Sequence, residues 1–186
     1  MSTRLKSAGR FTDGGAQLSF DFNGKKLKGV EVDTLASALL ANDQMMVGRS
    51  FKYHRPRGIV ASGGEEPNAL FNMGGTDDFE PNQRATVTEL FDGLKITSQN
   101  HWPSLEFDIG AINKHLSRFL PAGFYYKMFI HPRPLWKHVY EPFIRQSAGL
   151  GKAPRAQDRD PDTYEHFYHF TDVMVVGGGV AGLQSA

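Results

Sequence analysis

Three glycines near the end of the sequence have the spacing of a nucleotide-binding turn. The stretch DVMVVGGGVAGLQSA (172–186) contains Gly177, Gly179 and Gly182 in the pattern GxGxxG, directly after a short β-branched apolar run. A strand, this glycine pattern and a helix together form the dinucleotide-binding fingerprint, because backbone N–H groups at the helix start can hold a pyrophosphate. Gly177 would allow the tight turn, Gly179 the approach of the pyrophosphate, and Gly182 close packing of helix on strand.

We therefore predict a partial NAD site at the following residues: Gly177, Gly178, Gly179, Val180, Ala181 and Gly182. The acidic residue that binds the ribose hydroxyl normally lies about 20 residues further on, which is beyond Ala186. The sequence therefore leaves NAD, NADP and FAD as alternatives, and a plain glycine turn as a further one. A single strand and helix start cannot make a nucleotide domain, so residues 171–186 alone are expected to be frayed.

A second glycine-containing loop, RGIVASGGEEPNAL (57–70), has the spacing of an iron–sulfur cluster loop. A plant-type [2Fe–2S] ferredoxin places cysteines in such a loop as C-x4-C-x2-C, and Ala61, Glu66 and Ala69 have the same spacing here. None of the three supplies a thiolate, and the whole sequence contains no cysteine. We expect a loop with the shape of a cluster cradle and no iron–sulfur cluster, with a simple surface turn as the alternative.

The remaining candidate residues for chemistry form no recognisable constellation. Seven histidines are present, and His166 and His169 are three residues apart, but no histidine–carboxylate set has the spacing of a metal site. Serine and histidine occur without a G-x-S-x-G elbow. We predict no metal site and no catalytic residue in this chain.

The overall composition is that of an ordinary globular protein of 186 residues, with 21 Lys and Arg against 20 Asp and Glu. This balance argues against a nucleic-acid-binding protein. One segment, RSFKYHRPR (49–57), is basic and aromatic. It is a solvated loop, a contact for an anionic partner or, as a further alternative, a contact for RNA or DNA. No signal peptide or membrane-length apolar run is visible, so we expect a cytoplasmic protein that does not contact a membrane.

The elements that position these loops predict an α+β fold. After a flexible N-terminal arm (1–16), alternating residues flank Asn23-Gly24 and predict a hairpin over 18–32. Residues 33–43 predict a helix, capped by Asp33 or Thr34, whose apolar face includes Leu35, Leu39 and Leu40. A hairpin followed by a helix is how a β-grasp, ferredoxin-like domain begins.

That ferredoxin-like domain is expected to cover residues 17–100. The stretch RATVTELFDGLKITSQN (84–100) predicts a further strand pair around an Asp92-Gly93 turn. The last part of the fold is the first strand, turn and helix of a Rossmann-type NAD-binding domain at 171–186.

Between these two parts we predict a helical aromatic connector and linker at 101–170. Five apolar residues share one helical stripe: Ile109, Ile112, Leu116, Phe119 and Leu120. The aromatic stretch 123–144 predicts short helices and turns, which either pack on the chain's own domains or form a subunit interface. Residues 145–167 are polar, contain Pro and Gly, and predict a linker.

Three stretches carry a resemblance to a known family: SFKYHRPRGIVASGGEEPNAL (50–70), LPAGFYYKMFIHP (120–132) and DVMVVGGGVAGL (172–183). They resemble the N-terminal part of the alpha subunits of heterotetrameric sarcosine oxidases. Related amine-dehydrogenase subunits keep the loop cysteines and hold a cluster, whereas the sarcosine oxidase branch typically lacks them, as this sequence does.

The resemblance implies a subunit of an enzyme that oxidatively demethylates sarcosine to glycine, hydrogen peroxide and a one-carbon unit for tetrahydrofolate. It implies beta, gamma and delta subunits as partners, NAD on the alpha subunit, FAD in the beta subunit and FMN between alpha and beta. Folate and both flavins would be bound outside this chain, which would act as a scaffold and interface. The alternatives are a subunit of a dehydrogenase for another secondary amine, such as an opine, and a non-enzymatic β-grasp interaction module.

Overall fold

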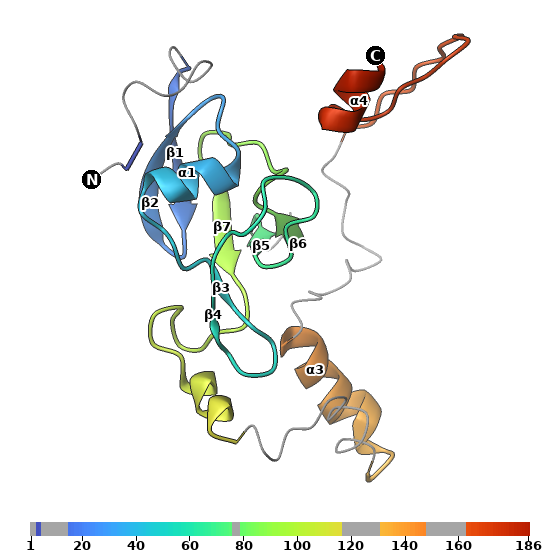
Figure 1. Ribbon diagram of the computed structural model, residues 1–186. Helices are drawn as coiled ribbons and strands as arrows, with labels where there is room; N and C mark the ends of the chain where they lie inside the picture. The colour runs from blue at the N-terminus through green and yellow to red at the C-terminus, as the bar shows by residue number, and fades with distance from the viewer. Residues whose placement is uncertain (1–2, 5–14, 76–78, 117–130, 148–162) are drawn as a thin grey trace. The chain divides into compact units, whose positions relative to one another are not determined.

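The computed structural model describes residues 3–4, 15–75, 79–116, 131–147 and 163–186 (Figure 1). The chain divides into two units, Met1–Ala153 and Pro154–Ala186, and each is described by itself. The first unit contains a mixed sheet that carries the candidate cradle loop. Most of the predicted N-terminal arm (1–16), namely residues 1–2 and 5–14, lies outside the described residues.

The predicted hairpin is confirmed. Strands β1 (Gln17–Phe22) and β2 (Lys25–Val30) pair antiparallel. Asn23 and Gly24 form the turn with φ of 52° and 82°, the left-handed conformation that an Asn-Gly turn accommodates. The Asp21 carboxylate accepts the N–H of Gly24 at 2.7 Å, which stabilises the turn.

The sheet is completed by segments that lie far apart in the sequence. Its strand order is β2-β1-β7-β5-β6. Strand β7 (Lys95–Ser98) runs parallel to β1 and antiparallel to β5 (Leu70–Met73), which in turn pairs antiparallel with β6 (Glu80–Arg84). A two-stranded ribbon, β3 (Gly48–Arg49) and β4 (Pro56–Arg57), lies outside this sheet.

The strand pair expected within 84–100 is wrong. Asp92-Gly93 does form a turn, with Gly93 at φ 78°, but only the segment after it is a strand. Residues 85–94 contribute buried side chains instead, among them Ala85, Leu90 and Leu94. Strand β7 therefore takes its partners from distant parts of the chain and not from the adjacent segment.

Helix α1 (Leu35–Ala41) follows the hairpin as predicted, with Thr34 as its N-cap, which accepts the N–H of Ser37 at 3.3 Å. Leu35 and Leu39 are fully buried, whereas Leu40 is 38% exposed, contrary to expectation. On a helix with 3.6 residues per turn, successive residues are about 100° apart around the axis, so Leu39 and Leu40 point in different directions. Leu40 therefore lies off the buried stripe.

The core of the first unit lies between α1 and the sheet. Its largest buried side chains are Phe22, Phe71, Leu35, Leu39, Leu94, Ile96 and Val47. Phe22 and Phe71 meet edge to face with ring centroids 5.7 Å apart, an arrangement that aromatic quadrupoles favour. This core fixes β5 and β7, and with them the end of the candidate cradle loop.

The predicted connector forms short helices where the structure describes it. A 3-10 helix η1 spans Ile109–Lys114, a π-helical turn η3 spans Trp136–Tyr140, and α3 spans Glu141–Ser147. The predicted stripe is not buried, since Ile109, Ile112 and Leu116 are 49%, 59% and 45% exposed. Phe119, Leu120 and most of the linker lie outside the described residues.

In the second unit, α4 spans Val180–Ser185, where a helix start was predicted. The strand expected over Val173–Val176 is absent from the described part of this unit. Val173 and Val176, at the two ends of this stretch, are largely exposed. A parallel strand needs a neighbouring strand to bond to, and the described residues of this unit include no strand. No helix among the described residues is long and apolar enough to cross a membrane.

Candidate functional site

The candidate cradle loop (57–70), which leads into β5 and is called the Glu66 loop below, closes around a carboxylate. Glu66 is 1% exposed, and its Oε2 accepts the backbone N–H groups of Val60 at 2.8 Å and Ala61 at 2.6 Å. Its Oε1 accepts those of Asn68 at 2.8 Å and Ala69 at 3.1 Å. Residues that flank Glu66 on both sides in the sequence thus point their N–H groups at one side chain.

The electrostatics of this loop favour the charged form of Glu66. Burial raises the pKa of the carboxyl, but the four backbone hydrogen bonds lower it, and the net result is a pKa below the ordinary value. The loop is also tied to its surroundings, because the Thr86 hydroxyl and the Glu66 N–H both donate to the Gly63 carbonyl, at 2.7 and 3.2 Å. The sequence placed Glu66 at a ligand position but gave no sign that its side chain turns inward.

A second buried carboxylate, Asp108, connects the β3–β4 ribbon to the loop before η1. Its Oδ2 lies 2.7 Å from Nδ1 of His54 and 3.6 Å from Nε of Arg49. Its Oδ1 accepts the N–H groups of Trp102 at 3.0 Å and Gly110 at 3.1 Å. Sequence reasoning missed this network, since His54 and Asp108 are 54 residues apart in the sequence.

Arg49 belongs to the same network and is not a free cation. Its guanidinium donates to the carbonyls of Leu105 at 2.8 Å, His54 at 2.9 Å and Glu106 at 3.0 Å. A methyl group added at Gly110 would lie 2.3 Å from the His54 ring, so the contact between the two segments is close. Two residues of the basic segment 49–57, Arg49 and His54, therefore have a structural role, because they hold this segment to the residues before η1.

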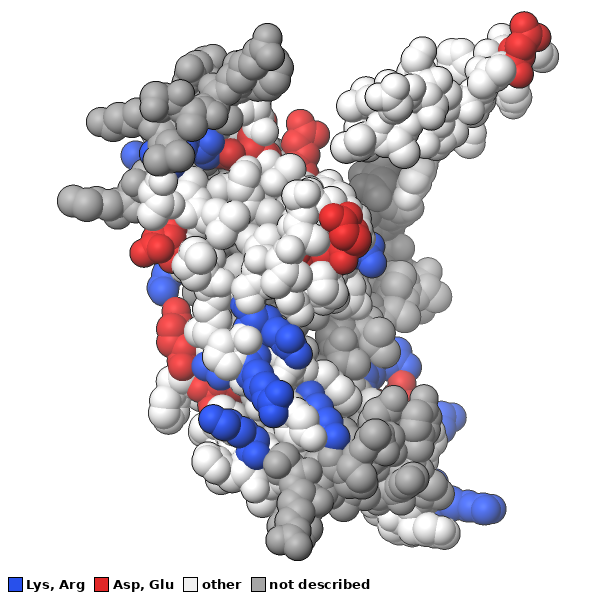
Figure 2. All heavy atoms as spheres, viewed as in Figure 1, with Lys and Arg blue, Asp and Glu red and all other residues white. Residues whose placement is uncertain are grey.

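The rest of that basic segment lies at the surface. Figure 2 shows Lys and Arg side chains gathered on the face that carries the β3–β4 ribbon. Lys52 and Arg55 lie 4.7 and 4.9 Å from the ring centroid of Tyr53, in cation–π geometry, and Arg57 is exposed. A contact with an anionic partner stays a prediction.

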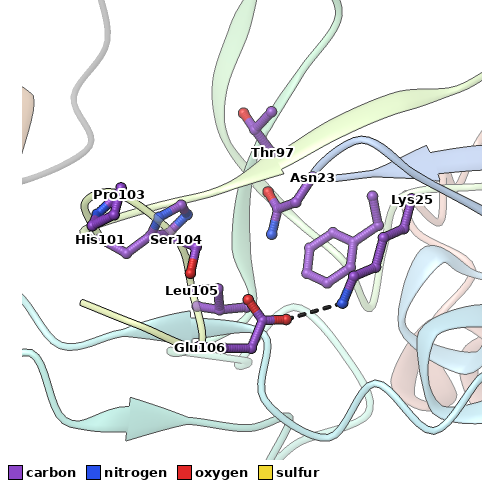
Figure 3. Close-up of a pocket in the computed structure, with 9 residues that line it drawn as sticks. Asn23, Lys25, Thr97, His101, Pro103, Ser104, Leu105 and Glu106 are labelled. Carbon is purple, nitrogen blue, oxygen red and sulfur yellow. Dashed lines mark hydrogen bonds and ion pairs between the residues drawn. The ribbon is translucent and has the colours of Figure 1, made fainter.

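A pocket of about 320 Å³ lies beside the β1–β2 turn (Figure 3). Its lining residues are Phe22, Asn23, Lys25, Thr97, His101, Pro103, Ser104, Leu105 and Glu106. Lys25 and Glu106 form an exposed ion pair of 3.0 Å across it. The acid and the base at this pocket thus neutralise each other.

Next to this pocket, a serine and a histidine are paired, yet the pair is structural. Ser98 Oγ lies 2.8 Å from Nε2 of His101 and accepts a hydrogen bond from the Asn23 amide at 2.8 Å. The Asn23 side-chain oxygen Oδ1 in turn accepts the backbone N–H of Ser98 at 2.9 Å. Burial lowers the pKa of His101 and outweighs the opposing charge of Asp108. The buried hydroxyl holds the hairpin turn against β7, so it is not presented as a nucleophile.

Of the predicted nucleotide-binding glycines, Gly177, Gly178 and Gly179 lie in the turn ahead of α4, and Gly182 lies within α4. Gly177 has a φ of 117°, which favours glycine, and a Cβ at Gly182 would lie 2.0 Å from the Gly177 carbonyl oxygen. Gly178 and Gly179 have open space where a Cβ would stand, and Val180 and Ala181 begin α4. The predicted NAD site at these residues stays a prediction.

The described residues include no group of three or more His, Cys, Asp or Glu side chains placed to hold a metal ion. Of the histidines considered above, His166 and His169 lie in the exposed stretch before α4. The sites that the structure does assemble are the Glu66 loop, the Asp108 network and the pocket.

The cradle-like shape of the Glu66 loop agrees with a family comparison. The family model described as "2Fe-2S iron-sulfur cluster binding domain" matches residues 15–101. Together with the mixed sheet and the helix packed on it, this match supports the predicted α+β, ferredoxin-like fold of that region. It does not extend to residues 171–186, so the Rossmann part of the prediction is untested.

Comparison with curated proteins gives relatives that all carry one name. "Sarcosine oxidase subunit alpha" of Rhizobium meliloti (strain 1021) is 56% identical over 185 residues, which is 100% of this chain and 18% of that protein. The protein of the same name from Corynebacterium sp. (strain U-96) is 30% identical over 91% of this chain and 13% of its own length.

Among solved structures, L-proline dehydrogenase from P. horikoshii is 26% identical over 48% of this chain and 16% of that one, with a TM-score of 0.39. A score this low carries no argument about the fold. The sequence relatives carry the assignment, and the chain spans less than a fifth of their length. The resemblance read from the sequence is therefore confirmed: over its whole length, this chain is homologous to a portion of sarcosine oxidase subunit alpha.

Proposed function

We propose that this chain is part of the alpha subunit of a multisubunit sarcosine oxidase, a flavin-dependent amine oxidoreductase. The observation that carries this proposal is the 56% identity to a sarcosine oxidase alpha subunit along the whole chain. The reaction implied by the family is oxidative demethylation of sarcosine to glycine, with hydrogen peroxide and a one-carbon unit passed to tetrahydrofolate.

Within that enzyme, we propose that residues 15–116 act as scaffold and interface and not as a catalytic centre. The buried carboxylates Glu66 and Asp108 are engaged by backbone and basic groups, and the Ser98–His101 pair secures a turn. These acidic and basic groups are therefore engaged in structural contacts. FAD, FMN and folate would be bound elsewhere, by the remainder of alpha and by the beta, gamma and delta subunits.

The second part of the proposal is that Gly177–Gly182 begins the NAD site of the complete subunit. The left-handed φ of Gly177 and the close approach of Gly182 to its carbonyl support this role, because the dinucleotide turn requires both features. Gly179 offers the open backbone that a pyrophosphate would approach.

The test is sarcosine-dependent oxygen consumption by the natural full-length protein, purified together with the subunits that accompany it. Uptake of oxygen with formation of hydrogen peroxide is expected. A flavin-loaded complex that is inactive with sarcosine but oxidises another secondary amine would support the alternative of an opine-type dehydrogenase. A full-length protein that carries no flavin and has no flavin-bearing partner would support the β-grasp interaction module.

A further inference from the structure

The residues of the cradle loop do not fit the cluster that its family would bind. Alanine side chains at 61 and 69 have no ligand atom, and the sequence has no cysteine. The residue between them, Glu66, has both carboxylate oxygens occupied by backbone N–H groups. The interior of the loop is thus taken by a side chain, and no ligand set for iron remains in it.

The way in which the loop surrounds this side chain is that of an anion-binding nest. Successive backbone N–H groups that converge on one point bind anions, and such concavities occur at phosphate and iron–sulfur sites. Here two of the converging groups belong to Ala61 and Ala69, which are the positions where the ferredoxin spacing would place cysteines. The N–H groups are therefore arranged around the interior that a cluster would fill.

Glu66 supplies the negative charge that this arrangement requires. A buried backbone N–H without an acceptor is costly, and a hydrogen bond to a charged acceptor is about twice as strong as a neutral one. Four such bonds offset the cost of burying one carboxylate that is 1% exposed. Without this anion, the donors of Val60, Ala61, Asn68 and Ala69 would face an empty interior.

We propose that the Glu66 carboxylate is an internal replacement for the iron–sulfur cluster, and that the loop over residues 58–69 is an anion receptor that this carboxylate keeps closed. Removal of the side chain would open a site for a small monocarboxylate anion. The proposal rests on the loop and on its family match, and is independent of the activity proposed above.

The test is amide hydrogen exchange in the natural full-length protein, followed by mass spectrometry on peptides covering residues 58–70. In Glu66→Ala the amides of Val60, Ala61, Asn68 and Ala69 are expected to exchange roughly tenfold faster or more, because each loses a hydrogen bond to a charged group. The matched control is Glu65→Ala, which removes the same charge from the adjacent, exposed position and should leave the exchange unchanged.

Acetate provides the second arm, because it restores the CH₂–COO⁻ group that Glu66→Ala removes. Added acetate is expected to restore slow exchange in Glu66→Ala in a saturable way, whereas chloride at equal ionic strength is not. The proposal is wrong if the loop amides of Glu66→Ala without acetate exchange as slowly as those of the wild type. It is also wrong if acetate and chloride slow the exchange equally.

Glu66→Gln covers the case in which the alanine variant does not fold. The glutamine side chain has nearly the same shape, but its NH₂ group would face two of the N–H donors and accept from neither. Faster exchange of the loop amides is expected in this variant as well. If Glu66→Gln retains wild-type exchange, the carboxylate charge does not organise the loop and the proposal is wrong.

Discussion

The charge of a single residue, Glu66, should make the stability of the cradle loop dependent on pH. Its pKa in the folded chain lies below the ordinary value of 4.5, because backbone hydrogen bonds outweigh the effect of burial. A carboxyl with a lowered pKa contributes stability that is fully present above its unfolded pKa and is lost as the pH falls through its folded value.

The expected result is a difference in stability between wild type and Glu66→Gln that is full near neutral pH and shrinks below 4.5. Protonated Glu66 resembles glutamine, so acid removes the advantage of the wild type. Urea titrations of both full-length proteins at a series of pH values measure the difference. A difference in the free energy of unfolding that stays constant or grows on acidification would contradict this account. In the control, Glu65→Gln should differ little from the wild type in the free energy of unfolding at any pH.

Glu66 also shows how far the sequence could predict a site at the scale of one residue. The spacing of Ala61, Glu66 and Ala69 located the loop, and the missing cysteines excluded thiolate ligands. The inward turn of Glu66 depends on N–H groups whose direction is set by the folded backbone. No property of the amino-acid types alone separates Glu66 from its exposed neighbour Glu65.

At the scale of elements, the Asp108 network holds the β3–β4 ribbon to the segment that enters η1. Asp108→Asn replaces an oxygen beside His54 and Arg49 with an NH₂ group. We expect a loss of about 2–4 kcal/mol in the free energy of unfolding, since a buried partner is left without its acceptor. A urea titration of the full-length protein measures it.

The control for this change is Glu106→Gln, in the same segment. Glu106 pairs with Lys25 where both side chains are more than half exposed, and such surface pairs contribute at most about 1 kcal/mol. Equal losses in the free energy of unfolding of the two variants would mean that the burial of Asp108 does not strengthen its contacts between the β3–β4 ribbon and the segment that enters η1.

Elements formed by neighbouring residues were predictable, and those formed by distant residues were not. The β1–β2 hairpin depends on Asn23-Gly24 and on alternation within one short stretch, so it was identified correctly. Strand β7 bonds to β1 and β5, which are remote in the sequence. The local signal in 84–100 therefore suggested an adjacent partner that the fold does not use.

At the scale of the whole molecule, the second unit would supply the beginning of the proposed nucleotide site. It offers the Gly177–Gly182 turn and the helix α4, while Val173 and Val176 are 76% and 85% exposed. In a dinucleotide fold, the corresponding strand is buried between parallel neighbours, which fix the turn and supply the rest of the nucleotide pocket. A turn held in this way needs parallel strands, and the described residues of this unit include none.

We therefore expect the 186-residue chain to show no NAD binding at micromolar concentrations by isothermal titration calorimetry. The natural full-length protein, titrated in the same buffer, is the positive control and should bind. Micromolar binding by the 186-residue chain would contradict this expectation, because the glycine turn and α4 would then suffice as a site. Binding by neither protein would instead count against Gly177–Gly182 as an NAD site.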